Sequence, residues 1–341
     1  MSLKAFLSFR FIFGALLLAI FFAVYWQYFS YQRFLSEPLK IDRNAQVIVK
    51  KGQGLSSLAK ELTQKKIISN YYYLRLYCYL NPERSKLKLG EYLLDESDTP
   101  VSLMEKISKG KVIQYPFTIV EGANSFQILN KLAEESKLEQ DWGESEADLL
   151  NKLSIKHDKL EGWLFPDTYY YTKGASALAL LKQANQKMNN VLNELWQNRS
   201  EGLPYESAYE ALIMASIIEK ETGIASERDM IAGVFVRRLQ KNMRLQTDPT
   251  VIYGIGPEFD GDITYKHLRT PTAYNTYVIR GLPPTPIAMP GKEAIHAALN
   301  PAGGEWLYFV ATGDGGHKFS ETLEEHNKAV KAYLNRLKSS N

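Results

Sequence analysis

Two glutamates stand at the end of an apolar run, where a carboxylic acid can act as a general acid. The run ALIMASIIEKET, Ala211–Thr222, has almost no polar face before its end, so it predicts a buried helix. Glu219, Lys220 and Glu221 then lie at the margin of an apolar core. Burial raises a carboxyl pKa, as general acid catalysis near neutral pH requires. The alternative is a buried helix that reaches solvent here, with its charges in structural ion pairs.

Uncharged polar and aromatic side chains follow in two proline-braced segments. The first, MRLQTDPTVIYG, carries Gln246 and Asp248 around an Asp-Pro pair that predicts a rigid turn. The second, TPTAYNTYVIRGLPPTPIAMPG, carries Tyr274, Asn275 and Thr276. Amides, hydroxyls and aromatic faces on loops suit sugar recognition. A proline-rich surface crossing is the alternative, but it would not need so many uncharged polar groups. The segments therefore predict a carbohydrate site.

Other kinds of site find little support in the residues. Five histidines are scattered without a metal-binding spacing, at His157, His267, His296, His317 and His326. His317, in GGHKF, either lines the site from a hairpin or stabilises a turn. Cys78 is the only cysteine, which excludes a zinc cluster and a cysteine protease. No Gly-x-Ser-x-Gly elbow or phosphate-binding glycine loop occurs, and we expect no metal and no cofactor.

The overall composition is that of a globular protein. Hydrophobic residues make up 45% and charged residues 23% of the 341 residues, which is unlike a disordered chain. The net charge is +3, from 41 basic and 38 acidic side chains. Nucleic acid is therefore not an expected partner, because binding to phosphates favours a strongly basic surface. The length is sufficient for an anchor and two folded domains.

Residues 11–29, FIFGALLLAIFFAVYWQYF, contain no charge. As a helix rising about 1.5 Å per residue, the run spans nearly all of a hydrocarbon core of about 30 Å. A cleaved signal peptide is the alternative, but its apolar core would be shorter and no small-x-small cleavage site follows. Lys4 and Arg10 precede the run without an acidic residue. Residues 1–10 are therefore predicted to form a cytoplasmic tail, with the rest of the chain outside.

A linker and a small subdomain are predicted to follow. Residues 30–44 are polar and carry Pro38, as a linker would. Residues 45–112 alternate short strands with helices. Within them, Val47–Ala59 followed by Leu87, Gly90 and Tyr92 resembles the LysM carbohydrate-binding module, with a longer spacing between the two halves. The resemblance implies either glycan binding or a spacer of LysM-like fold without a ligand.

Residues 113–341 are predicted to form a larger catalytic domain. Its helices and short strands mix without βαβ alternation, which indicates the α+β class. Ser226–Asp229 has the form of a capping box that would start a helix. After Gln240 the chain is rich in proline and predicts loops. A strand at 306–311, a hairpin in GDGGHKF and a closing helix at 322–337 complete the predicted domain.

The long motifs of this domain resemble those of one family. They occur in the order EGWLFPDTY, ASIIEKET, ASERD, VFVRRL, MRLQTDPTVIYG, TAYNTY, GLPPTPIAMPG, YFVATGDGGHKF and EEHNKAV. Together they resemble the endolytic murein transglycosylases, the MltG/YceG-like family, from the anchor to nearly the last residue. The resemblance implies that the catalytic glutamate is Glu219, in ASIIEKET. The candidates for substrate binding are Glu161, Glu221, Gln246, Asp248, Tyr274, Asn275 and Thr276.

The resemblance implies a protein of the inner membrane, with its catalytic body in the periplasm, that acts on nascent peptidoglycan. Glu219 would protonate the oxygen of the β-1,4 bond between N-acetylmuramic acid and N-acetylglucosamine. It would then accept the proton of the muramyl 6-hydroxyl, which closes on the anomeric carbon. The products would carry 1,6-anhydro ends, and strand elongation would be limited. Expected partners are peptidoglycan glycan strands, the lipid bilayer and peptidoglycan synthases.

Two alternatives stay open at the level of sequence. The first is a non-catalytic, membrane-tethered module that binds peptidoglycan and positions synthases. The second is a muramidase-type hydrolase in which Glu221 or Asp248 activates water. The products separate these readings, because a binding module releases nothing and a hydrolase leaves reducing ends.

Overall fold

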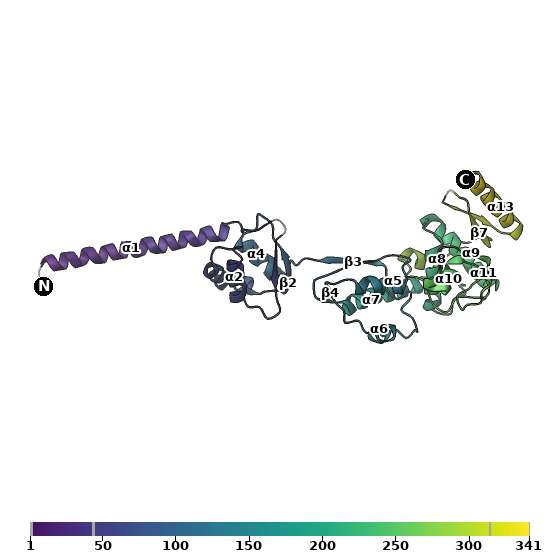
Figure 1. The fold of residues 1–341 in the computed structure, drawn as a ribbon, viewed down its shortest axis with the longest axis horizontal. Coiled ribbons are helices and arrows are strands. Elements are labelled where there is room, and N and C mark those ends of the chain that lie inside the picture. The colour runs from purple at the N-terminus through teal and green to yellow at the C-terminus, as the bar shows by residue number, and fades with distance from the viewer. Residues whose placement is uncertain (1–2, 43–44, 314, 341) are drawn as a thin grey trace. The chain divides into compact units, whose positions relative to one another are not determined.

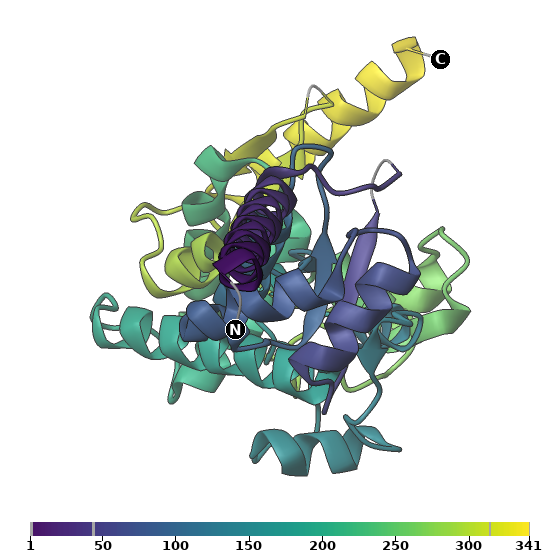
Figure 2. The same cartoon turned by 90° about the vertical axis from the view of Figure 1, so that its left-hand side faces the viewer.

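The computed structural model describes residues 3–42, 45–313 and 315–340, with side chains from residue 11 to residue 336 (Figures 1 and 2). The chain divides into two compact units, unit 1 (Met1–Tyr115) and unit 2 (Pro116–Asn341). Helices and two-stranded sheets occur in both units, so the fold is of the mixed α and β class that was predicted. The first two residues of the predicted tail, residues 43–44 of the predicted linker and Asp314 of the predicted hairpin lie outside the described residues.

Helix α1, Leu3–Ser36, contains a stretch that is long and apolar enough to cross a membrane, with a mean hydropathy of 1.9 over Phe11–Ser36. The helix continues past the predicted end of the span at residue 29 because its last turns pack against unit 1. The ring of Phe34 lies 5.6 Å from that of Tyr73, and Phe34 is only 2% exposed. Residues 30–36 of the predicted linker of residues 30–44 are therefore helical.

In unit 1, two helices separate two strands in the sequence, and the two strands pair with each other. Strand β1 pairs antiparallel with β2, and Val47 lies opposite Tyr92. Both of these side chains are buried, together with Leu58 and Leu74 from the two intervening helices. The alternation of buried and exposed residues along β1 is the period of two expected for a strand with one covered face. The elements after α1 are β1 (Gln46–Val49), α2 (Leu55–Gln64), α3 (Tyr71–Leu80), η1 (Pro82–Ser85), β2 (Gly90–Leu93) and α4 (Pro100–Lys109).

In the part that the structure describes, unit 2 is mainly helical, with three short sheets that pair β3 with β5, β4 with β6 and β7 with β8. Its first elements are β3 (Tyr115–Ile119), α5 (Ser125–Ala133), β4 (Leu138–Glu139), α6 (Glu146–Leu153), β5 (Asp167–Tyr171), β6 (Ala175–Ser176) and α7 (Ala177–Gln197). The elements that follow are α8 (Ala208–Glu221), η2 (Ala225–Glu227), α9 (Arg228–Gln240), α10 (Asp248–Ile255), η3 (Gly256–Glu258), α11 (Tyr265–Arg269), α12 (Lys292–Leu299), β7 (Tyr308–Ala311), β8 (His317–Ser320) and α13 (Leu323–Ser340).

Helix α8 forms the centre of unit 2. Every residue from 211 to 218 is buried, as the apolar composition of this segment predicts. Helices α7, α9 and α12 pack around it. The hydroxyl of Ser216 accepts a hydrogen bond of 3.0 Å from the backbone N–H of Ile287, which fixes the loop before α12 to this helix. Helix α8 ends at Glu221, so its charged last turn lies at the edge of the core.

Three local predictions are wrong. Asp248 and Pro249 open α10 instead of forming a turn. Proline fits the first turn of a helix because the backbone N–H that it lacks would have no partner within the helix there. The proline-rich region after Gln240 therefore contains α10, α11 and α12. The predicted capping box at 226–229 does not form, since Glu227 makes no side-chain cap bond to α9. Its carboxylate binds His317 instead.

The C-terminal hairpin and helix were predicted correctly. Strands β7 and β8 pair antiparallel, with Ala311 opposite His317. Figures 1 and 2 show α13 alongside this hairpin, in yellow. The hairpin is fixed to α9 by aromatic packing, because the rings of Phe235 and Phe309 meet edge to face at 5.6 Å.

Candidate active site

Helix α8 turns its two terminal glutamates in different directions. Successive residues of an α-helix are rotated by about 100°, so side chains two apart point to nearly opposite sides. The carboxylate of Glu219 accepts a 2.9 Å hydrogen bond from the backbone N–H of Gly291, before α12. The carboxylate of Glu221 accepts a hydrogen bond from the hydroxyl of Thr247, before α10. The two candidate acids therefore belong to separate surroundings.

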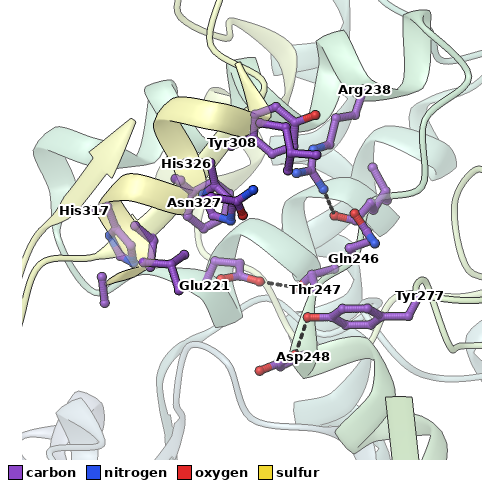
Figure 3. A pocket seen from close by; sticks show the side chains of 16 residues that line it. Glu221, Arg238, Gln246, Thr247, Asp248, Tyr277, Tyr308, His317, His326 and Asn327 are labelled. Carbon is purple, nitrogen blue, oxygen red and sulfur yellow. Dashed lines mark hydrogen bonds between the residues drawn. The ribbon is translucent and has the colours of Figure 1, made fainter. Parts of the chain in front are cut away.

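A cavity of about 550 Å³ lies on the Glu221 side of α8 (Figure 3). Its walls come from the end of α8, from α9, from the segment that leads into α10, and from the β7–β8 hairpin with α13. Glu219, which the structure also describes, is not among the residues that line this cavity. The polar side chains around it are Glu221, Arg238, Gln246, Thr247, Asp248, Tyr277, Tyr308, His317, His326 and Asn327.

The surroundings of Glu221 favour its protonated form. Burial raises the pKa of this carboxyl, and the hydrogen bond from Thr247 opposes the rise because it stabilises the charged form. The nearby charge of Asp248 raises the pKa further, whereas His317 and Arg238 lower it. The net shift is upward, so the carboxyl can hold a proton nearer to neutral pH than an exposed glutamate does.

The segment before α10, whose Thr247 bonds to Glu221, contains a residue with a strained backbone conformation. Gln246 has a φ of 55°, in the left-handed region that residues other than glycine rarely adopt. The next residue, Thr247, is 2% exposed and donates its backbone N–H to the hydroxyl of Thr276 at 3.1 Å. Thr250 bonds to the same hydroxyl at 2.8 Å. Thr276, predicted to bind substrate, is fully buried behind the cavity and positions Thr247 in this structure.

Two further groups shape the cavity. The hydroxyl of Tyr277 donates to Asp248 at 2.6 Å, which orients this carboxylate beside Glu221. Arg238, 7% exposed, donates to the carbonyl of Leu307 at 2.7 Å and to that of Leu245 at 2.6 Å. Arg238 thereby ties the β7–β8 hairpin to the segment that leads into α10. It was not among the predicted site residues, although it stands in the motif VFVRRL.

Glu219 meets a different set of groups on its own side of α8. The carboxylate of Glu121 lies over Gly291, since a methyl group added to this glycine would stand 2.0 Å from Glu121 Oε1. Burial raises the pKa of Glu219, the hydrogen bond from Gly291 opposes this, and the charge of Glu121 adds to it. Lys220 donates to the carbonyl of Gly122 at 3.3 Å. Glu121 was missed by the sequence reasoning.

The other predicted residues do not line the Glu221 cavity. Glu161 is 1% exposed and accepts hydrogen bonds from the backbone N–H of Ser125 at 3.0 Å and from Tyr253 at 3.1 Å. Burial raises the pKa of Glu161 to about 7. The hydroxyls of Tyr274 and Thr285 lie 2.9 Å apart. The fully buried Asn275 donates its side-chain amide to three backbone carbonyls, those of His267, Leu268 and Thr270.

The structure thus brings together three of the eight candidates, Glu221, Gln246 and Asp248, with Thr276 directly behind them. Glu219 lies on the other side of α8, and Glu161, Tyr274 and Asn275 pack elsewhere in unit 2. Among the residues that the structure describes, no three His, Cys, Asp or Glu side chains are grouped so that they could hold a metal ion.

Comparison with known proteins identifies the family. The pattern of the YceG-like family matches residues 47–332. This chain belongs to the YceG-like family. It is 33% identical over 333 residues to the endolytic murein transglycosylase of Bacillus subtilis, covering 90% of each chain. It is 27% identical over 349 residues to the protein of that name from Streptococcus pneumoniae, covering 90% of this chain and 62% of that protein. A crystal structure of a yceG-like protein from Listeria monocytogenes is 34% identical, covers 84% of this chain and 98% of that one, and has a TM-score of 0.53.

Most of the motifs that carry the YceG-like resemblance meet at the Glu221 cavity. Segments from six of them, far apart in the sequence, each supply polar lining groups (Figure 3). EKET supplies Glu221, VFVRRL supplies Arg238, LQTDP supplies Gln246, Thr247 and Asp248, NTY supplies Tyr277, GGHKF supplies His317, and EEHN supplies His326 and Asn327. Such convergence is typical of a ligand or reaction site.

Proposed function

We propose that this chain is a lytic transglycosylase of peptidoglycan that carries out its reaction in the Glu221 cavity. One observation carries the proposal. Of the two glutamates in the EKET motif, Glu221 is the one that lines the cavity at which five other motifs meet. The names of the Bacillus and Streptococcus relatives supply the reaction, which is endolytic murein transglycosylation.

In the proposed reaction, Glu221 is the general acid. Its protonated carboxyl donates to the bridging oxygen between N-acetylmuramic acid and N-acetylglucosamine, and a transition state with oxocarbenium character follows. The muramyl 6-hydroxyl closes on the anomeric carbon and leaves a 1,6-anhydro end. The nucleophile belongs to the substrate, so the effective molarity of a group held close replaces an activated water. No second carboxylate is required as a nucleophile, unlike in retaining hydrolases.

The neighbours of Glu221 suit this chemistry. Burial and the charge of Asp248 both favour the protonated acid, and Asp248, oriented by Tyr277, offers negative charge where positive charge develops on the sugar. The exposed side chain of Gln246 can donate to sugar hydroxyl or acetamido oxygens. The cavity volume of about 550 Å³ falls within the roughly 300–1,000 Å³ of typical small-molecule sites.

This proposal differs from the sequence-based assignment of Glu219 as the acid, which stays a prediction. Both glutamates are partly desolvated, but the groups around Glu219 are a backbone N–H, a second glutamate, Arg228 and Lys220. None of the polar groups of the Glu221 cavity is hydrogen-bonded to Glu219 among the contacts of the described residues. The roles of Glu161, Tyr274 and Asn275 in substrate binding stay predictions.

The same proposal includes the placement of the enzyme. Helix α1 would anchor the chain in the inner membrane, and the apolar stretch Phe11–Ser36 supports this. The N-terminus would lie in the cytoplasm and units 1 and 2 in the periplasm, which Lys4 and Arg10 before the stretch support. Unit 1 has the strand-helix-helix-strand order of a LysM-like subdomain, which supports contact with glycan. Cleavage of nascent strands beside a synthase would limit strand elongation.

Mass spectrometry of the products tests the proposed function. Full-length protein in detergent is incubated with intact murein sacculi and with isolated glycan strands. Fragments with 1,6-anhydro ends, one water lighter than hydrolysis products, are the expected result. Fragments with only reducing ends would indicate a muramidase, and binding without release would indicate a non-catalytic module.

A further inference from the structure

A second pair of titratable groups borders the Glu221 cavity and has no part in the reaction as described above. His317 opens β8, and Glu227 ends the η2 turn before α9. Nδ1 of the His317 ring lies 2.7 Å from Glu227 Oε2, and the His317 backbone N–H donates to Glu227 Oε1 at 2.8 Å. Both carboxylate oxygens of Glu227 therefore contact one histidine. This pairing also explains why Glu227 does not cap α9.

The pairing with Glu227 determines which nitrogen of the imidazole carries the hydrogen. A carboxylate only accepts hydrogen bonds, so Nδ1 carries the hydrogen and donates it to Glu227. When the ring is neutral, Nε2 keeps a lone pair that can accept a proton. The rings of Phe309 and His317 meet edge to face at 5.5 Å, which further restricts the histidine. Both paired side chains are 16% exposed, so the pair is largely withdrawn from bulk water.

His317 and Glu221 line the same cavity from different elements (Figure 3). Formation of the anhydro ring delivers one proton to the bridging oxygen and removes another from the muramyl 6-hydroxyl. A single carboxylate must serve both oxygens in turn, whereas two groups on one cavity can serve them together. Burial raises the pKa of Glu221, as suits a proton donor, and a neutral His317 has the lone pair that an acceptor requires.

We propose that His317, held by Glu227, is the base that accepts the proton of the muramyl 6-hydroxyl while Glu221 protonates the bridging oxygen. The bond between the anomeric carbon and the bridging oxygen breaks, and its electron pair leaves on that oxygen, which receives the Glu221 proton. The 6-hydroxyl oxygen bonds to the anomeric carbon as Nε2 takes its hydrogen. The step leaves an imidazolium and a carboxylate, and one proton returned from His317 to Glu221 restores both.

This inference rests on the proposed function and assigns different roles to the two members of the pair. His317 is a catalytic residue, because its Nε2 contacts the reacting hydroxyl. Glu227 is a positioning residue that acts through the histidine. Loss of the base slows ring closure, so water can compete for the anomeric carbon, and some products should then carry reducing ends.

The test compares His317→Asn with the native full-length protein on isolated glycan strands. Asparagine retains a side-chain N–H for Glu227 but has no group that accepts a proton, so the hairpin contact is preserved. We expect kcat for anhydro ends to fall about 100-fold, the low end of general base effects, with KM within 3-fold of the native value. The fraction of reducing ends should rise above the native fraction.

Glu227→Gln and His296→Ala complete the test. The amide of glutamine can donate to Nδ1, which moves the ring hydrogen to Nε2, so we expect a loss in kcat of about 10-fold or more with KM unchanged.

His296 is exposed on α12, away from the cavity lining, and its alanine variant should match the native protein. Thermal unfolding checks that each variant is folded.

The inference is overturned if His317→Asn keeps native kcat, or if anhydro and reducing ends fall together in an unchanged ratio. The second outcome would mean that the histidine only supports the fold of the cavity. These outcomes differ from failure of the proposed function, in which Glu221→Gln would remain active or the native protein would release no anhydro ends.

Discussion

Glu219 and Glu221 stand two residues apart on α8, yet they face different parts of unit 2. Glu219 faces the backbone of Gly291 and the carboxylate of Glu121. Glu221 faces a cavity whose polar lining comes from six motifs. Burial raises the pKa of both, so a raised pKa alone does not distinguish a catalytic acid from a buried structural carboxylate. The difference lies in the partners and in the space for a substrate.

The largest expected effect comes from removing the group that holds the cavity walls together. Arg238→Ala leaves the carbonyls of the buried Leu245 and the half-buried Leu307 without their donor, which should cost roughly 2–6 kcal/mol at about 1–3 kcal/mol per unsatisfied group. Thermal unfolding should show a Tm lower by several degrees, and release of anhydro ends should be lost. Lys241→Ala, at an exposed position after α9, is the control. An unchanged Tm would mean that Arg238 does not join the two walls.

The next prediction concerns the charge beside Glu221. The charge of Asp248 raises the pKa of Glu221, so Asp248→Asn should lower that pKa. Glu221 must be protonated to act as the acid, and activity is lost as pH rises through its pKa. The alkaline limb of the kcat/KM profile should therefore move to lower pH. If the alkaline limb does not move, Asp248 does not influence the pKa of the catalytic acid.

Thr247→Val should move the same limb in the opposite direction. The Thr247 hydroxyl donates to Glu221 and lowers its pKa by stabilising the carboxylate. Valine has nearly the same shape and cannot donate, so the pKa of Glu221 should rise and the alkaline limb should move to higher pH. Activity should fall by about 10-fold, in line with a loss of roughly 1.5 kcal/mol for a hydrogen bond to a charged group. Opposite shifts in the two variants would be difficult to explain with any acid other than Glu221.

The smallest effect is expected on the other side of α8. Gly291 has φ −75° and ψ 171°, a conformation that alanine adopts readily. Gly291→Ala requires that the flexible side chain of Glu121 move, since its Oε1 and carboxyl carbon would lie 2.0 and 2.5 Å from the added Cβ. We expect kcat within about 3-fold of the native value and a stability change within about 1 kcal/mol. A loss of activity as large as that of Arg238→Ala would instead implicate the Glu219 side.

Sequence reasoning predicted the position of the acids along the chain but not their direction. The apolar residues of α8 predict burial on all faces, and that is why they carry no information about which side faces a cavity. The rotation of this helix is fixed by α12 and by the bond of Ser216 to Ile287, which are contacts between distant segments. The choice between Glu219 and Glu221 therefore depends on tertiary packing.

The loop candidates show a related limit. Gln246 and Asp248 line the cavity, as expected for polar residues beside a rigid element. Asn275 and Thr276 have equally suitable side chains, but both are fully buried and bonded to the chain itself. Amides and hydroxyls satisfy backbone groups as readily as they bind sugars, and only the fold decides between these uses. The contact of Glu227 with His317 was missed for the same reason, since the two residues lie 90 positions apart.

The most direct test of the account assays Glu221→Gln and Glu219→Gln side by side on the same glycan strands, with anhydro ends counted by mass spectrometry. Glutamine retains the shape of each side chain and removes only the acid. We predict that Glu221→Gln lowers the release of anhydro ends at least about 1,000-fold, as expected for loss of a general acid, while Glu219→Gln stays within about 10-fold of the native protein. A folded Glu221→Gln variant with native activity, beside an inactive Glu219→Gln, would contradict the account.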